Sequence, residues 1–578
     1  MRNIAEFNSL QSFLTAYLIG HKNYEILTDE NLPGILGSSK HVLNIANSFY
    51  IPLIFKSQTG LHTFKNALFE KKNDHYKQIS FSLFVHKICD TEKVSQENVK
   101  IFKLRVLKSL KTIEAILKDK KFLLEQISKL QDFSFQSTEQ SLVFGHFSHP
   151  YPKLQESELK NNQAHLEKTL NLKWCLVHKS LLHLEFSKHF TNSQVKSIVE
   201  DLFRVDQGRD LPLKEDYTLF PFHPTQHEYI LEDKIIKKYF KENLIINIEN
   251  KNTKMLWIPT TSLRTIYNEI SPWMLKFSLP VRLTNSIRTL QDNEVKRGIQ
   301  LHEVFHSKKG LKLQTESDIS ALKIIHEPLF LALKDEENRV MKNTIVVFRE
   351  NPFLKNESNT IALASLNQIS SYKESPLLAL LIEKISERDQ LTYEETALKW
   401  FDFYLEKVIF PFVILQGRHG IYLGAHQQNV IIQLGEDLYP KASFYRDCQG
   451  TGYSELGFMN FKNEAESLNT PNGNVLSTNF ANSLIGYYLF INSTLFTIKT
   501  LANKSSTIED KFIKIFQKKL KSLPDIKDSS FINYVLNSKS FLIKDNFECC
   551  LNNINENTID NPLKFYKEFK NPFFAGEL

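Results

Sequence analysis

The sequence predicts an α+β fold that is divided into several domains. Its 578 residues exceed the size at which a single hydrophobic core stops growing, so two to four units of roughly 100–200 residues are expected. The 42% hydrophobic content, with 44 Phe and 20 Tyr, supplies ordinary globular cores. Helical periodicity near the amino terminus and short β-rich runs further along the chain predict the mixed class.

The first 140 residues are expected to be mainly helical. Apolar residues recur at three- and four-residue steps between Val99 and Leu130, with lysines between them. This spacing places the apolar side chains on one face of an amphipathic helix.

Residues 141–360 are expected to mix helices and strands. His-Pro and Pro-Thr pairs interrupt this region, and β-rich runs such as Thr344–Phe348 occur in it.

Residues 361–578 form the third predicted unit. Thr392 and Glu395 have the spacing of a capping box, which predicts the start of a long amphipathic helix that continues through Phe412. The runs Asn429–Leu434 and Ala442–Tyr445 predict a hairpin supported by helices.

Charge and cysteine usage exclude several classes of protein. The net charge of +7 comes from 72 basic and 65 acidic residues without a block of five or six like charges, so neither nucleic acid nor a membrane surface is expected as a partner. No signal peptide core or stretch of eighteen uncharged apolar residues is found. Small molecules are the expected partners. Five cysteines without a CxxC pair predict buried thiols and a reducing, cytoplasmic environment.

Two His-Pro segments contain candidate binding residues. Gly145–Lys153 includes His146, His149 and Lys153, which suit a phosphate if they converge. A histidine pair at this spacing also suits zinc, but no third ligand lies close by, and capped or surface histidines are the ordinary alternative. The second segment, Pro221–Gln226, is interpreted as a structural turn.

A third segment is the richest in cations and hydroxyl groups. Ser262, Arg264, Thr265 and Lys276 supply the donors that a polyphosphate needs, because its negative charge must be stabilised as a phosphoryl bond breaks. Further along, Arg288 with Thr284 forms a plausible fork for a carboxylate. The alternative is a solvated basic face, to which Arg282 is assigned.

The fourth segment combines amide, imidazole and carboxylate groups. If Asn429 begins a strand, then His426, Gln428 and Asn429 lie at its mouth, where loops commonly carry binding groups. Asp447, next to Arg446, suits ribose hydroxyls or a magnesium ion that accompanies ATP. A surface Arg-Asp turn is the alternative.

The four segments together resemble those of the IucA/IucC family, the ATP-dependent synthetases that assemble siderophores independently of non-ribosomal peptide synthetases. The shared patterns are Gly-His-x-x-His-Pro-x-x-Lys, His-Pro-x-x-Gln, Ser-x-Arg-Thr with a later Lys and Thr-x-x-x-Arg, and His-x-Gln-Asn followed by Arg-Asp. The resemblance covers about residues 140–455. The chain departs from the family pattern at Gln155, Ser157 and Gly424, where Arg, Gly and Glu are usual.

The resemblance implies a cupped hand, with a thumb over 1–140, fingers over 141–360 and a palm over 361–578. It places ATP and the acid between fingers and palm. The implied ATP ligands are His146, His149, Lys153, Ser262, Arg264, Thr265, Lys276, Gln428, Asn429 and Asp447, of which Asp447 is also the candidate magnesium contact. Thr284, Arg288 and His426 would bind the acid, and Arg264, Lys276, Arg288 and His426 would be catalytic.

The implied reaction is adenylation of a carboxylate, with citrate the most common acid of the family, followed by capture by an amine or hydroxyl group. The cofactors would be ATP and Mg²⁺, and the assembly a homodimer. Two alternatives are a catalytically silent ligand-binding protein with the same fold and a phosphotransferase that makes ADP.

Overall fold

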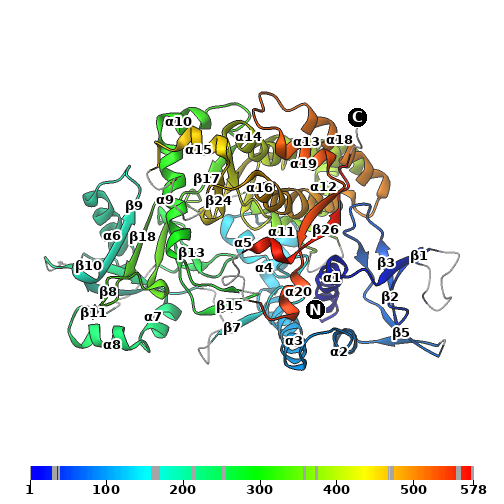
Figure 1. The fold of residues 1–578 in the computed structure, drawn as a ribbon, viewed down its shortest axis with the longest axis horizontal. Helices are drawn as coiled ribbons and strands as arrows, with labels where there is room; N and C mark the ends of the chain where they lie inside the picture. The colour runs from blue at the N-terminus through cyan, green and yellow to red at the C-terminus, as the bar shows by residue number, and fades with distance from the viewer. Residues whose placement is uncertain are drawn as a thin grey trace.

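The computed structural model describes residues 2–28, 36, 39–73, 75–157, 169–210, 215–249, 255–284, 286–355, 359–370, 375–465, 468, 474–554 and 561–574. Helices and several sheets coexist in them, which confirms the α+β class. Figure 1 shows an amino-terminal region in blue, a middle region in green and a carboxy-terminal region in olive to red. No described helix has both the length and the apolar character needed to cross a membrane.

The amino-terminal region combines helices with an antiparallel sheet. Its helices are α1 (Arg2–Gly20), α2 (Phe81–Cys89), α3 (Gln96–Asp119), α4 (Lys121–Ser128) and α5 (Phe135–Gln140). Its strands are β1 (Tyr24–Thr28), β2 (His41–Ile45), β3 (Phe49–Phe55), β4 (Thr63–Phe64), β5 (Leu68–Lys72) and β6 (His75–Ile79). The helix predicted from Val99 onward is confirmed as α3 and α4. The sheet was not predicted, and its central strands β2 and β3 are rich in β-branched and aromatic residues.

The amino-terminal core also contains a helix from the far end of the chain. The ring of Phe547, on α20 (Asn546–Leu551), lies 5.4 Å from that of Phe13 and 5.1 Å from that of Phe102. The core of the predicted 1–140 unit is therefore completed by residues far from it in sequence.

The middle region contains two principal sheets. Its strands are β8 (Lys173–His178), β9 (Leu182–Phe186), β10 (Tyr217–Phe222), β11 (Ile245–Asn247), β12 (Ile258–Pro259), β13 (Thr265–Tyr267), β14 (Trp273–Phe277), β18 (Leu329–Leu333) and β19 (Val346–Glu350). The larger sheet has the order β12-β13-β14-β19-β18-β9, and the smaller one β10-β8-β11. The helices α6 (Asn192–Gln207), α7 (Pro224–Ile230) and α8 (Lys234–Lys241) lie beside them. The predicted β run begins as a strand at Val346, after a short 3₁₀ turn, η4 (Lys342–Thr344).

The Pro221–Gln226 segment is a structural turn, as expected. His223 is buried, and its Nδ1 accepts a hydrogen bond from the Thr225 amide at the start of α7. Gln226 Nε2 donates to the Asn343 carbonyl at 2.9 Å. These contacts fix α7 against η4.

The carboxy-terminal region is built on a four-stranded sheet. Its strands β17 (Leu322–Ile324), β23 (Pro440–Tyr445), β22 (Val430–Leu434) and β20 (Thr360–Ala362) lie in that order, so the predicted hairpin is confirmed as β22 and β23. The surrounding helical elements are α11 (Leu363–Asn367), α12 (Leu377–Asp389), α13 (Tyr393–Tyr404), η5 (Leu405–Ile409), α14 (Phe410–His419), α15 (Glu455–Phe461), α16 (Thr478–Ile485), η7 (Gly486–Leu495), α17 (Phe496–Ala502), α18 (Ser506–Lys521) and α19 (Ser530–Asn537).

The capping box is also confirmed. Thr392 Oγ1 accepts from the Glu395 amide at 3.2 Å, and Glu395 Oε2 accepts from the Thr392 amide at 2.9 Å. The helix runs past Phe412 to His419 because the π-helical turn η5 joins α13 to α14.

Helix α9 (Asp292–His306), α10 (Lys308–Gln314) and β17 pack into the carboxy-terminal core. Leu301, Phe305 and Leu322 belong to the same buried cluster as Trp400. The predicted boundary near residue 360 therefore does not separate the cores, because α9 lies between the middle and carboxy-terminal sheets.

Candidate active site

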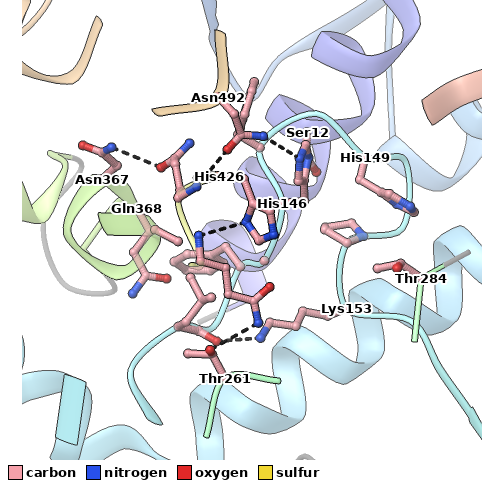
Figure 2. Close-up of a pocket in the computed structure, with 18 of the residues that line it drawn as sticks. Ser12, His146, His149, Lys153, Thr261, Thr284, Asn367, Gln368, His426 and Asn492 are labelled. Carbon is pink, nitrogen blue, oxygen red and sulfur yellow. Dashed lines mark hydrogen bonds between the residues drawn. The ribbon is translucent and has the colours of Figure 1, made fainter. Parts of the chain in front are cut away.

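A cavity of about 470 Å³ is lined by residues from all three regions. Figure 2 shows His146, Thr261 and His426 among the side chains around it. All of the site residues expected from the sequence line this cavity: His146, His149, Lys153, Ser262, Arg264, Thr265, Lys276, Thr284, Arg288, His426, Gln428, Asn429 and Asp447. The fold therefore brings the first, third and fourth segments together.

The cavity lining is strongly cationic. Ten lysine and arginine side chains line it, against the two carboxylates of Glu139 and Asp447. Such an excess of positive charge in a concave site attracts polyanions.

A tight turn between β12 and β13 carries the third segment. The Leu263 amide donates to the Thr260 carbonyl at 2.9 Å, and Leu263 adopts a φ of 62°, in the left-handed region that non-glycine residues seldom occupy. Ser262 Oγ accepts from the Thr265 amide at 3.2 Å. The turn holds the Ser262 hydroxyl and Arg264 at the edge of the cavity.

Lys276 lies at the centre of a buried ion network. It stands opposite Thr265 in the β13–β14 register, is 1% exposed, and its Nζ donates to Glu327 at 3.3 Å and also to Asp447. Arg349 on β19 donates through Nε to Glu327 at 2.8 Å, and its Nη2 lies 3.7 Å from Asp447. Two buried cations thus share two carboxylates.

Asp447 remains ionised within this network. Burial by itself raises the pKa of the carboxyl, but the charges of Lys276, Arg264 and Arg349 hold it well below its usual range. Asp447 is the second residue after β23 and adopts a φ of 75°, and its side chain is 31% exposed. The carboxylate is therefore fixed on one side and accessible on the other.

A second network joins the third segment to the fourth. Arg446 Nη1 lies 2.9 Å from Glu139 Oε2, with both side chains buried, and Arg446 Nη2 donates to Thr261 Oγ1 at 2.9 Å. The Thr261 amide donates to the same Glu139 oxygen at 2.9 Å, and Gln428 Nε2 donates to Thr261 Oγ1 at 3.2 Å. Thr261 consequently fixes Gln428 beside the turn of the third segment.

The first segment is held both by contacts within it and by contacts with residues far from it in sequence. The Nδ1 atoms of His146 and His149 accept from the amides of Ser148 and Tyr151, and His149 Nε2 lies 3.6 Å from the Cys550 sulfur. Lys153 Nζ donates to the Leu142 carbonyl at 2.6 Å. His146 Nε2 in turn lies 3.1 Å from Asn492 Nδ2. Both ring nitrogens of each histidine thus have protein partners, and the contacts of the two rings with phosphate stay predictions.

The predicted acid-binding residues lie close to one another in the cavity wall. Arg288 Nη2 donates to the Leu283 carbonyl and to Thr284 Oγ1, each at 3.3 Å, where β15 (Val281–Leu283) pairs with β16 (Ser286–Ile287) and β7 (Gln155–Ser157). Burial lowers the pKa of His426 to about 4, so the ring is neutral. Because its Nδ1 accepts from the Gln428 amide at 3.3 Å, the ring carries its proton on Nε2 as a donor.

Sequence reasoning missed Glu139, Thr261, Glu327 and Arg349. Arg349 carried a usable signal, since it follows the apolar run Val346–Phe348 in a buried strand, where a charge requires a partner. Glu139 and Glu327 are single carboxylates without a motif, and only the tertiary structure places them beside cations.

Asp447 is the cavity residue best suited to magnesium. Mg²⁺ commonly takes one or two carboxylates together with substrate phosphates and water. Glu139 is occupied by Arg446 and the Thr261 amide, whereas Asp447 keeps an accessible side. Gly424 supplies no carboxylate, and a Cβ there would lie 3.2 Å from the Gly450 carbonyl oxygen. The residues fit an ion bound chiefly through the nucleotide.

Comparisons of sequence give a consistent family. The IucA / IucC family model matches residues 134–368, and the ferric iron reductase FhuF-like transporter model matches residues 398–559. The N(2)-citryl-N(6)-acetyl-N(6)-hydroxylysine synthase of Vibrio mimicus is 31% identical over 98% of this chain and 96% of its own length. The spermidine-citrate ligase of Bacillus anthracis is 27% identical over 99% of this chain and 98% of its own.

Comparison of the fold with solved structures identifies the same family. ATP-bound aerobactin synthetase IucA from Klebsiella pneumoniae matches with a TM-score of 0.86 and 26% identity, over 98% of this chain and 99% of that chain. The fold and the cationic cavity are those of an ATP-dependent ligase of siderophore biosynthesis. The chain belongs to the IucA/IucC family of siderophore synthetases, as its motifs predicted.

Replacing Glu327 by Gln is expected to lower the free energy of unfolding by about 3–5 kcal/mol, because Lys276 and Arg349 lose their shared buried counter-charge. Thermal unfolding measures the effect. The matched control is Glu336→Gln, whose carboxylate pairs with Lys238 at the surface and should change the melting temperature little. Equal melting temperatures for the two variants would contradict a structural role for the Glu327 charge.

Proposed function

We propose that this protein uses ATP to adenylate a carboxylate of citrate or a citrate derivative and then joins the acyl group to an amine or hydroxyl group. The observation that carries the proposal is the cavity itself, where ten cationic side chains face two carboxylates. ATP and citrate are both polyanions, and their combined charge suits this excess. The names of the relatives from Vibrio mimicus and Bacillus anthracis support citrate as the acid.

In the first step, a carboxylate oxygen of the acid attacks the α-phosphorus of ATP, and the bond to pyrophosphate breaks. Ser262, Arg264 and Lys276 are assigned to the phosphates, because fixed donors and cations stabilise the charge that develops on the phosphoryl oxygens. His146, His149, Lys153 and Thr265 are assigned to the same group of ligands. The buried partners of Lys276 keep its ammonium in place without solvent reorganisation.

Arg288, Thr284 and His426 are assigned to the acid. The guanidinium of Arg288 offers paired donors to one carboxylate, and the neutral His426 ring offers Nε2–H. In the second step an amine or hydroxyl attacks the acyl carbon, AMP leaves, and the nucleophile loses its proton.

Gln428, Asn429 and Asp447 are assigned to the nucleotide, and Asp447 would also hold magnesium. A bound magnesium ion would supply positive charge that offsets part of the negative charge of the phosphates. The cytoplasmic location that cysteine usage indicates and the homodimer that the resemblance implies stay predictions.

Pyrophosphate release is the direct test. With ATP, magnesium and an amine or hydroxylamine, the protein should release pyrophosphate and AMP when citrate is added, and less with 2-oxoglutarate or succinate, which carry fewer carboxylates. Mass spectrometry identifies the condensation product. Formation of ADP would indicate a phosphotransferase, and nucleotide binding without any product would indicate a silent binding protein.

Arg264→Ala should remove more than nine-tenths of the turnover, because a cation directed at the phosphates in a closed site is worth several kcal/mol. The matched control is Arg282→Ala, since Arg282 is not among the cavity-lining residues and lies 3.9 Å from Glu156. Steady-state pyrophosphate release compares them. A rate above about a tenth of wild type, a loss below about 1.4 kcal/mol, would remove Arg264 from the phosphate set.

Arg288→Lys should greatly reduce kcat/KM for the acid while ATP affinity measured without the acid changes little. Lysine keeps the charge but loses the two parallel donors of the guanidinium. Calorimetric titration of ATP and initial rates at varied citrate separate the two effects, with Arg282→Lys as the control. Equal weakening of ATP binding would move Arg288 into the phosphate set.

A further inference from the structure

A cluster of histidines lies at the end of α9, outside the residues that line the cavity. His302 and His306 are one turn apart with ring centroids 3.7 Å apart, and Glu350 is the last residue of β19. One ligand atom from each of these three residues lies within 4.8 Å of the others. The ring of His326 lies 5.3 Å from that of His302 and 5.1 Å from that of His306.

Neighbouring groups orient these rings. His306 Nδ1 donates to the His302 carbonyl at 2.9 Å, which leaves the lone pair on Nε2, and His302 Nδ1 lies 2.8 Å from Ser187 Oγ. Contacts of this kind on one ring nitrogen are what fixes the other as a metal ligand. His326 Nδ1 is buried and has no hydrogen-bond partner among the described residues.

Among the described residues, no lysine or arginine forms an ion pair with Glu350. Its carboxyl group accepts a hydrogen bond from the His326 amide at 3.3 Å. A divalent cation bound beside the histidine rings would supply the positive charge that this half-buried carboxyl group lacks.

The sequence of α9 also has a spacing of residues that is typical of zinc sites. His302-Glu303-Val304-Phe305-His306 has the His-Glu-x-x-His spacing that puts two imidazoles on one helix face toward zinc, and Glu350 supplies a third ligand from another element. In hydrolytic enzymes the glutamate of this motif acts as a base. Here Glu303 is buried and its Oε1 accepts from the Lys188 amide at 3.0 Å, which favours a structural role.

We propose that His302, His306 and Glu350 bind a divalent transition-metal ion, with His326 as the fourth ligand. Three imidazoles and one carboxylate suit tetrahedral Zn²⁺. The ion would join α9 to the end of β19 and to the segment before β18. It is a structural site, separate from the magnesium assigned to the nucleotide.

This site would lie next to the buried ion network around Lys276 and would help to hold it in place. Arg349 and Glu327, which hold Lys276 and Asp447, are adjacent in sequence to Glu350 and His326. Since neighbouring residues of a strand point to opposite faces, Arg349 and Glu350 project from the two sides of β19.

Metal content of the full-length protein tests the proposal. After removal of metal by EDTA and dialysis, the protein should take up one equivalent of Zn²⁺ in competition with a chromophoric chelator, and its melting temperature should rise. The variants His306→Gln and Glu350→Gln should each weaken Zn²⁺ binding by about 100-fold or more and abolish the rise. Two variants are used so that, if one of them fails to fold, the other still tests the proposal.

The matched control is His183→Ala. His183, Glu185 and Asp292 also lie close enough to share an ion, but Lys296 lies 3.2 Å from Glu185 and 2.8 Å from Asp292 and balances them. This variant should bind Zn²⁺ as the wild type does. The proposal is overturned if the wild type takes up no Zn²⁺ above the level of His306→Gln, or if the two site variants bind it with wild-type affinity.

Discussion

The buried ion network around Lys276 is the interaction on which the geometry of the site depends. Lys276 and Arg349 come from the middle sheet, Asp447 follows a strand of the carboxy-terminal sheet, and Glu327 joins them. A buried charge without a partner is costly, so each of these groups constrains the others. The two sheets are consequently held at a separation that leaves the cavity between them, and Thr265 is fixed through its place opposite Lys276.

The other cations of the cavity are less well balanced by charge than Lys276 and Arg349, because fewer carboxylates lie near them. Burial together with Lys120 lowers the pKa of Lys153 to about 7, and burial lowers that of Lys499 to about 8. These lysines hold their protons less firmly than exposed lysines do. A bound polyanion would reverse this effect, because it favours the charged ammonium form. The cavity should therefore bind highly charged anions more tightly than ligands with less negative charge.

The sequence predicted the chemistry of the site better than the arrangement of the chain. Motifs such as Ser262, Arg264 and Thr265, which are close in sequence and form a recognisable set of donors, located residues that the fold gathers around one cavity, and the role of each residue stays a prediction. Glu139 and Glu327 were missed because no local motif places their partners beside them: Lys276 and Arg349 lie 51 and 22 residues from Glu327, and Arg446 is farther still from Glu139. For the same reason, helical periodicity found α3, while the packing of Phe547 into the amino-terminal core had no local signal.

Strand β19 shows how one element can serve two sets of groups. Arg349 projects to the face where Lys276 and Asp447 lie, and Glu350 projects to the histidines of α9. A displacement of this strand end would therefore alter both sets together, even though no side chain of the histidine cluster lines the cavity. Helix α9 also lies close to the ion network, because at Gly298 it approaches the segment before β18 so closely that an added Cβ would lie 3.0 Å from the Glu327 carbonyl oxygen. Helix α9 therefore carries the histidines that lie beside Glu350 and also packs against Glu327, the carboxylate that pairs with Arg349 and Lys276.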